Sequence, residues 1–327
     1  MIKKNIYYIK LIILFIFLLL IFLWSINSGE IKIKDIFINN TLSKEDLFIL
    51  FELRLPRIFL GLIVGIILSI TGLVLQSLFR NPLVDPYIIG VSGGGALGAG
   101  IAILFNLQFD FLGINSLTII SFVTALITML IVYRLGTMGK IIYIDRLLLS
   151  GVAISAMTSA ILSLILVIKG KGMETVVYWI MGSLSGREWQ EVKMSIPLSV
   201  IGIILIIINL KNLNIFQLGE ETALHLGVNV QKLKITIIIA STLLAATSVS
   251  VSGIIGFIGL IVPHISRLLI GDCDIRMVFP ITILLGGSIL VAADTISRII
   301  LPDQQIPVGI FTSIIGVPFF LFMLIKK

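Results

Sequence analysis

The chain has 327 residues, of which 58% are hydrophobic and only 13% are charged, against about 25% charged residues in soluble domains. This composition excludes an ordinary water-soluble fold. Lys and Arg number 24 against 17 Asp and Glu, a net charge of +7, which in a membrane protein indicates topology and contact with anionic lipid rather than nucleic-acid binding.

Apolar runs of about 17 to 25 residues recur along the chain, and each is long enough to cross the hydrocarbon of a bilayer as a helix. They are too long and too continuously apolar for barrel strands of about 10 residues. The predicted fold class is therefore all-α, a single polytopic membrane domain over residues 1–327. The ten predicted transmembrane helices cover 6–26, 58–79, 87–105, 115–134, 146–168, 190–209, 233–252, 255–270, 277–297 and 306–325.

The first apolar run follows several lysines and so imitates a signal peptide. It nevertheless reaches spanning length, and no A-x-A-like cleavage site follows it, so we expect a retained first span. With an even number of spans and the N-terminus inside, 14 of the 24 Lys and Arg fall on the cytoplasmic side. This asymmetry supports that orientation, and we expect a multi-pass protein of the cytoplasmic (inner) membrane of a bacterium.

Arginines mark the outer ends of two predicted spans. Arg54 and Arg57 precede the second span, where their side chains either reach the lipid headgroups or offer bidentate docking to a carboxylate of an external partner. Asp294 and Arg298 are spaced i, i+4 at the end of the ninth span, so they can pair on one helix face. The pair either neutralises two costly charges near the membrane or aims Arg298 outward beside Arg54.

The second span and the stretch after it are rich in glycine and proline. Closely spaced glycines let another helix approach, and so much glycine would weaken a plain spanning helix. The pattern indicates close packing or a backbone that lines a passage. The motif G-x-x-x-x-G-K-[ST] occurs nowhere in the chain, so any ATP that drives this protein binds to another polypeptide. The residues assigned to packing or to the passage are Gly61, Gly65, Gly72, Gln76, Asn81, Pro82, Gly90 and Ser92.

A short polar segment interrupts the apolar pattern at 218–227. Acidic residues at its start favour a helix N-terminus, and a glycine at its end can provide a left-handed cap. About two helical turns result, too few to cross a membrane. Such a helix either rests on the lipid surface or lies in a groove of a cytoplasmic partner. The residues assigned to this segment are Gly219, Glu220, Glu221, Ala223, Leu224, Leu226 and Gly227.

Metal chemistry and catalysis find little support in the composition. The chain has two histidines, His225 and His264, and one cysteine, Cys273, so no metal site is predicted and His264 is interpreted as structural. No nucleophile, base and oxyanion donors converge in the pattern, so an enzyme is not expected. The alternative function is an ion-coupled secondary transporter with Asp294 as the proton or cation site.

Seven motifs, taken in order, resemble the FecCD-type permeases, the membrane subunits of ABC importers for iron siderophores, haem and cobalamin. The resemblance covers nearly the whole chain after the first helix. The motifs are RLPR at 54–57, the run with RNPL at 76–86, IIGVS at 88–92, LGEETALHLGV at 218–228, GFIGLIVPHISR at 256–267, ADTISR at 293–298 and IPVGIFTSIIGVPFF at 306–320.

The resemblance implies a ten-helix, cobalamin-importer-like permease that forms a homodimer around a central passage. Two separate ATPase subunits would bind ATP on the cytoplasmic side, and a substrate-binding protein would dock outside; the permease would need no cofactor of its own. Arg54 and Arg298 match family arginines that receive acidic residues of the binding protein, with Arg57 beside them. The segment 219–228 matches the coupling helix. The resemblance favours an iron siderophore as cargo, with haem and cobalamin as alternatives.

Overall fold

The computed structural model describes residues 2–28, 44–111, 113–170, 172–300 and 306–325, and these are almost entirely helical. The predicted all-α fold class is confirmed. The helices are α1 (Ile2–Asn27), α3 (Lys44–Phe48), the π-helix η1 (Ile49–Arg54), α4 (Leu55–Leu78), α5 (Val91–Leu104), α6 (Ser116–Gly136), α7 (Ile144–Lys169), α8 (Met173–Ile180), α9 (Trp189–Phe216), α10 (Glu220–His225), α11 (Val230–Ser252), α12 (Ile258–Ile270), α13 (Ile275–Ile300) and α14 (Val308–Ile325). Two short antiparallel hairpins pair β1 (Asp110–Phe111) with β2 (Ile114–Asn115) and β3 (Thr137–Met138) with β4 (Ile141–Ile142).

In the described part of the chain, seven helices are long and apolar enough to cross a membrane. One of them is continuous over α3, η1 and α4, and the other six are α1, α6, α7, α9, α11 and α13. Three shorter apolar helices, α5, α12 and α14, accompany them. Together they correspond to the ten predicted spans. Short spans are tolerated at membrane depth when neighbouring protein satisfies the freed backbone groups.

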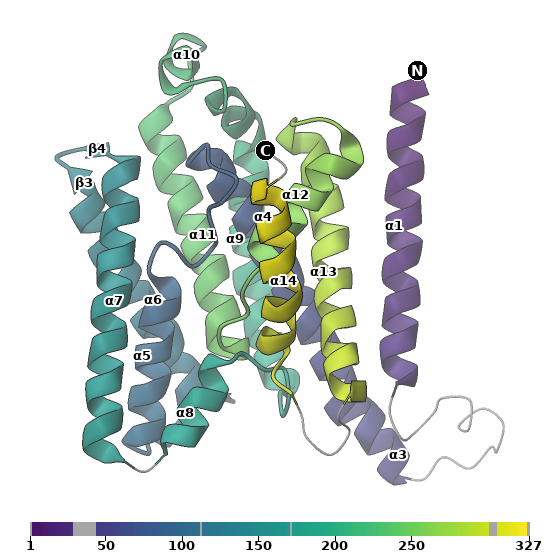
Figure 1. The fold of residues 1–327 in the computed structure, drawn as a ribbon, viewed down its shortest axis with the longest axis vertical. Coiled ribbons are helices and arrows are strands. Elements are labelled where there is room, and N and C mark those ends of the chain that lie inside the picture. The colour runs from purple at the N-terminus through teal and green to yellow at the C-terminus, as the bar shows by residue number, and fades with distance from the viewer. Residues whose placement is uncertain (1, 29–43, 112, 171, 301–305, 326–327) are drawn as a thin grey trace.

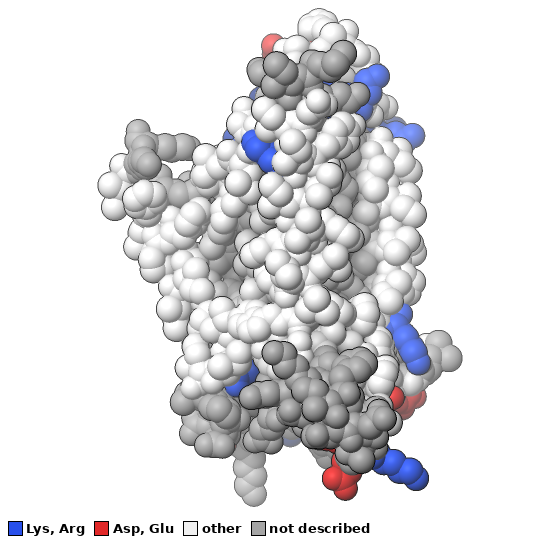
Figure 2. All heavy atoms as spheres, turned by 90° about the vertical axis from the view of Figure 1, so that its right-hand side faces the viewer, with Lys and Arg blue, Asp and Glu red and all other residues white. Residues whose placement is uncertain are grey.

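The helices stand side by side, with α4 and α11 at the centre and α1 and α7 on opposite edges (Figure 1). Helix α4 packs against α9, α11, α12 and α13. Both chain ends and α10 lie at one end of the molecule, here called the α10 end, while α3 and α8 lie at the other, the α3 end (Figure 1). On the face that carries α1, charged side chains lie toward these two ends (Figure 2). The white band between them in Figure 2 shows no charged side chain, as expected for a protein that spans a bilayer.

The second span begins earlier than predicted. The sequence suggested a start near residue 58, with Pro56 at its first turn, but the helix runs unbroken from Lys44. The reason lies in η1, where the N–H of Leu55 bonds the carbonyl of Leu50, five residues back. Pro56 has no N–H to donate, and the π turn just before it accommodates this missing bond within the helix.

Two further spans begin later than predicted. The third was expected from residue 87, but α5 starts at Val91, because residues 79–90 form turns in which Asp85 accepts the N–H of Tyr87 at 2.8 Å. Asp side chains that bond nearby backbone compete with helix formation. The eighth was expected from residue 255, but α12 starts at Ile258 after Phe257, whose φ of 67° is left-handed.

Two helical segments lie where loops were expected. Helix α9 was predicted to end near residue 209 but continues to Phe216, so part of the polar stretch before α10 is helical. Helix α8 was not predicted. It follows Gly172, whose φ is 86°, carries Glu174 in its first turn and buries Val176 and Trp179. An eight-residue amphipathic helix gives too short a periodic signal to separate it from a loop.

Candidate functional site

The arginines of the sequence motifs gather at the α3 end around one buried carboxylate. Arg57 on α4 and Asp294 on α13 meet because these two helices pack along much of their length. The Nε atom of Arg57 lies 3.0 Å from both carboxylate oxygens, and its Nη2 lies 2.8 Å from Oδ1. The two side chains are 10% and 3% exposed. This is a buried, bidentate, charge-assisted pair.

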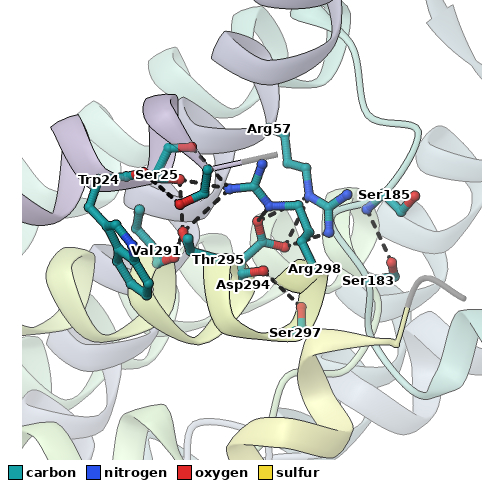
Figure 3. A network of polar contacts seen from close by, with 11 residues as sticks. Trp24, Ser25, Arg57, Ser183, Ser185, Val291, Asp294, Thr295, Ser297 and Arg298 are labelled. Atoms are coloured by element: carbon teal, nitrogen blue, oxygen red, sulfur yellow. Dashed lines mark hydrogen bonds and ion pairs between the residues drawn. The ribbon is translucent and has the colours of Figure 1, made fainter. Parts of the chain in front are cut away.

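The second arginine on this carboxylate is Arg298, whose Nε lies 3.4 Å from Oδ2 of Asp294. The predicted i, i+4 pair on α13 is therefore present. Arg298 also donates from Nη2 to the hydroxyl of Ser25 on α1 at 2.8 Å (Figure 3). Thr295 donates to the same hydroxyl at 2.8 Å. We call Arg57, Asp294, Arg298 and Ser25 the arginine cluster; it ties together α1, α4 and α13.

Arg54 lies beside this cluster, at the end of η1. Its Nη1 donates to the carbonyl of Ile26 at 3.1 Å, and Arg298 reaches the carbonyl of Ser25 at 3.4 Å. Both arginines thus complement the last turn of α1, where carbonyl groups lack helical partners. Sequence reasoning missed Ser25, because a single serine within an apolar run carries no signal of its partners.

The three predicted docking residues are thus brought together, but in different settings. Arg57 is turned inward onto Asp294, so a direct contact with an external partner suits it least. Arg298 is somewhat more exposed, at 16%. A docking role for Arg54 and Arg298 stays a prediction.

The arginine cluster argues against the alternative in which Asp294 is an ion-coupling site. Such a site must bind and release a cation during transport, whereas Arg57 and Arg298 both occupy this carboxylate.

Glycines of α4 allow direct contact between backbones. A methyl group at Gly65 would overlap the carbonyl of Gly286 on α13, and one at Gly72 would overlap the carbonyl of Gly259. Gly61 has more room, with the nearest side chain 3.1 Å from an added methyl group. Small residues at helix crossings permit this approach in membrane proteins.

Gln76 links α4 to α12 by two hydrogen bonds. Its Nε2 donates to the carbonyl of Gly259 at 3.1 Å, and its Oε1 accepts from Nη1 of Arg267 at 2.7 Å. The other residues assigned to packing or the passage lie in the turn after α4 and at the start of α5, namely Asn81, Pro82, Gly90 and Ser92. Whether any of them lines a passage stays a prediction.

Helix α10 has the predicted ends. Gly219, with φ 127°, precedes it, and Glu220 and Glu221 occupy its first turn. Gly227, with φ 80°, follows it; its N–H bonds the carbonyl of Leu224, and the N–H of the next residue bonds the carbonyl of Ala223, each at 2.9 Å. These two bonds form a Schellman cap.

The two faces of α10 differ in character. Ala223 is fully buried in the main core. Leu218, Leu224 and Leu226 are each more than half exposed, and α10 projects at the end that carries the chain termini (Figure 1). Exposed leucines on a projecting segment are typical of a surface that a partner covers.

His264, predicted to be structural, packs edge-on against Phe319, with ring centroids 6.2 Å apart. Among the residues that the structure describes, no three His, Cys, Asp or Glu side chains are placed to hold a metal ion.

The apolar helices and the charged residues gathered at their ends identify a mainly helical, multi-pass membrane protein. Residues 11–326 match the model of the FecCD transport family, and the chain belongs to that family. The cobalamin import system permease protein BtuC of Halobacterium salinarum is 41% identical over 272 residues, 83% of this chain and 72% of the relative. The hemin transport system permease protein HmuU of Yersinia pestis is 35% identical over 317 residues, 96% and 94% of the two chains.

A solved structure assigned to a metal-chelate type ABC transporter in an inward-facing conformation has the same fold. The TM-score is 0.83 at 31% identity, covering 98% of this chain and 100% of that one. The chain is accordingly the permease subunit of an ABC importer, a multi-pass component of the cytoplasmic membrane and not an enzyme.

Proposed function

We propose that this permease carries a large metal chelate, in first place an iron siderophore, with haem and cobalamin as the alternatives. Relatives that cover most of the chain are named for hemin and cobalamin, and the structural neighbour is assigned to a metal-chelate type transporter. The test is uptake by vesicles that contain the permease, its ATPase and its binding protein. Radioactive ferric siderophore, haem and cobalamin are offered in turn. Uptake of none of the three would contradict the proposal.

The permease works as a homodimer with two ATP-binding subunits and one extracytoplasmic binding protein. ATP binds to the partner subunits, whose closure displaces α10 and rocks the spans between outward and inward openings. A ligand can bias two states only through its different affinity for each. The passage therefore binds cargo weakly, and nucleotide supplies the bias between the two states.

Helix α10 is the coupling segment toward the ATPase. The observation that carries this assignment is a projecting helix with exposed Leu224, flanked by exposed Leu218 and Leu226 and anchored by buried Ala223 (Figure 1). Helix-in-groove contacts use such an apolar face. Replacing residues 219–228 by a Gly/Ser linker abolishes the stimulation of ATP hydrolysis by loaded binding protein. Stimulation equal to that of the parent protein would rule out the role.

Arg54 and Arg298 receive acidic side chains of the binding protein. The arginine cluster supports this, because its two guanidinium groups share one carboxylate and an external carboxylate would complement the remaining positive charge. Arg54→Glu together with Arg298→Glu abolishes capture of the binding protein and uptake. The matched control is Arg276→Glu at the opposite end of α13, which leaves capture intact. Capture and uptake that survive the double substitution would contradict the assignment.

A further inference from the structure

A lysine with no assigned role is buried at the α10 end. Lys234 on α11 is 3% exposed. Its ammonium lies 2.8 and 2.9 Å from the two carboxylate oxygens of Glu220 on α10, and 3.2 Å from the carbonyl oxygen of Ile142 on β4. A lysine ammonium has three hydrogens to donate, and three acceptor oxygens are present. Three separate elements, α10, α11 and β4, therefore meet at one positive charge.

A second contact holds β4 to α11. The N–H of Ile142 donates to Oε1 of Gln231 at 3.0 Å. Gln231 and Lys234 are three residues apart on α11 and so lie on one helix face. Both backbone groups of Ile142 are thus bound by side chains of α11. The β3–β4 hairpin connects α6 to α7, so this contact fixes that connection to α11.

The backbone by itself leaves α10 weakly held. The helix lies between Gly219 and Gly227, both with left-handed φ, and no atom outside the local chain lies within 4 Å of a methyl group added at Gly227. Ala223 is the one residue of α10 that is buried. A short helix between two glycines can tilt unless a side chain fixes it to its neighbours.

Stability alone does not require this ion pair: Lys234 is buried but the side chain of Glu220 is 36% exposed, and a pair with an exposed member contributes little to stability. A charged pair with three acceptors does, however, define one geometry. We propose that Lys234 is a positioning residue that joins α10, α11 and the β3–β4 hairpin, so that a displacement of α10 moves α11 and the α6–α7 connection with it. This inference rests on the proposed coupling role of α10.

The geometric test uses the permease alone in lipid nanodiscs. Spin labels are placed on cysteines at the exposed positions Thr222 on α10 and Lys140 in the hairpin, after Cys273→Ser. Lys234→Met broadens the distance distribution between the labels at least twofold. Lys232→Met, an exposed lysine on the same helix, leaves it unchanged. An equal width in the Lys234→Met and parent proteins would overturn the proposal.

The functional test measures cargo moved per ATP hydrolysed in vesicles that hold the whole importer. Lys234→Met lowers this ratio about tenfold, while basal ATP hydrolysis and assembly with the ATPase stay within twofold of the parent. If Lys234→Met does not fold, Lys234→Gln carries the test, because its shorter, uncharged side chain gives up the ion pair with Glu220 and leaves the sequence of α10 unchanged. A parental ratio in the variant that folds would overturn the proposal.

The two proposals fail in different ways. If the linker in place of 219–228 leaves stimulated ATP hydrolysis unchanged, the coupling role of α10 is wrong and this inference falls with it. If the linker abolishes stimulation while Lys234→Met, or Lys234→Gln in its place, keeps the parental ratio, only the role of Lys234 is wrong.

Discussion

Asp294→Asn is the substitution that most directly probes the arginine cluster. The carboxylate of Asp294 accepts three hydrogen bonds from Arg57 and faces Arg298 at 3.4 Å, with 3% of its side chain exposed. Asparagine keeps the shape but removes the negative charge, so two buried guanidinium groups are left side by side. Removing one partner of a buried ion pair costs about 3–5 kcal/mol.

The melting temperature of the permease in detergent measures this loss. At about 2 °C per kcal/mol, the value for the larger domains surveyed, Asp294→Asn melts about 6–10 °C below the parent. The matched control is Asp274→Asn, which breaks the Asp274–Arg276 pair. That pair is shorter, at 2.6 Å, but its arginine is 56% exposed. Exposed pairs contribute little, so the control melts with the parent.

A double substitution separates lost charge balance from lost packing. Arg57→Met with Asp294→Leu removes the Arg57–Asp294 pair and leaves one guanidinium, that of Arg298, without its carboxylate, whereas Asp294→Asn leaves two. The double variant therefore melts above Asp294→Asn. Equal melting temperatures for Asp294→Asn and Asp274→Asn would show that burial makes no difference to the stability that the two pairs contribute.

The same melting assay tests two further contacts of α4. Gly72→Ala forces a methyl group onto the carbonyl of Gly259 and costs about 1–3 kcal/mol of stability. The control is Gly256→Ala, where an added methyl group has a single neighbouring atom at 3.9 Å, so stability is unchanged. Equal losses of stability in the two variants would disprove the close contact at Gly72. Gln76→Leu leaves the half-buried guanidinium of Arg267 without its acceptor and costs about 1–3 kcal/mol. Gln108→Leu removes an exposed hydrogen bond and leaves stability unchanged. A Gln76→Leu protein as stable as its control would show that this bond is not needed.

The spans could be predicted because the length of an apolar run is a strong local signal. The exact ends of the spans depend on single hydrogen bonds, which the apolar pattern does not indicate. Nothing in the sequence shows that a π turn before Pro56 extends the second span to Lys44, or that an Asp85 turn delays the third. The π turn depends on a hydrogen bond between two backbone groups, and the Asp85 turn depends on one between a backbone N–H and a side chain. Helix α10 was predicted well, because Gly219, the two glutamates and Gly227 each carry a helix-end signal.

The candidate sites were predicted only where partners are close in sequence. The pair of Asp294 with Arg298 is an i, i+4 contact and could be seen. The partner Arg57 lies 237 residues away, and no periodicity links the two. Lys234 was missed for a similar reason: it follows Lys232 at the start of a span, where lysines usually face the headgroups, and only the fold shows that one is buried and the other exposed.

This permease moves its cargo only when a partner hydrolyses ATP. Accumulation of radioactive ferric siderophore by reconstituted vesicles measures this dependence. Vesicles with the permease, ATPase and binding protein accumulate the chelate when ATP is present, even after a protonophore has dissipated the ion gradient. Vesicles with the permease alone accumulate none. Accumulation against the concentration gradient by the permease alone, driven by an ion gradient, would contradict the account.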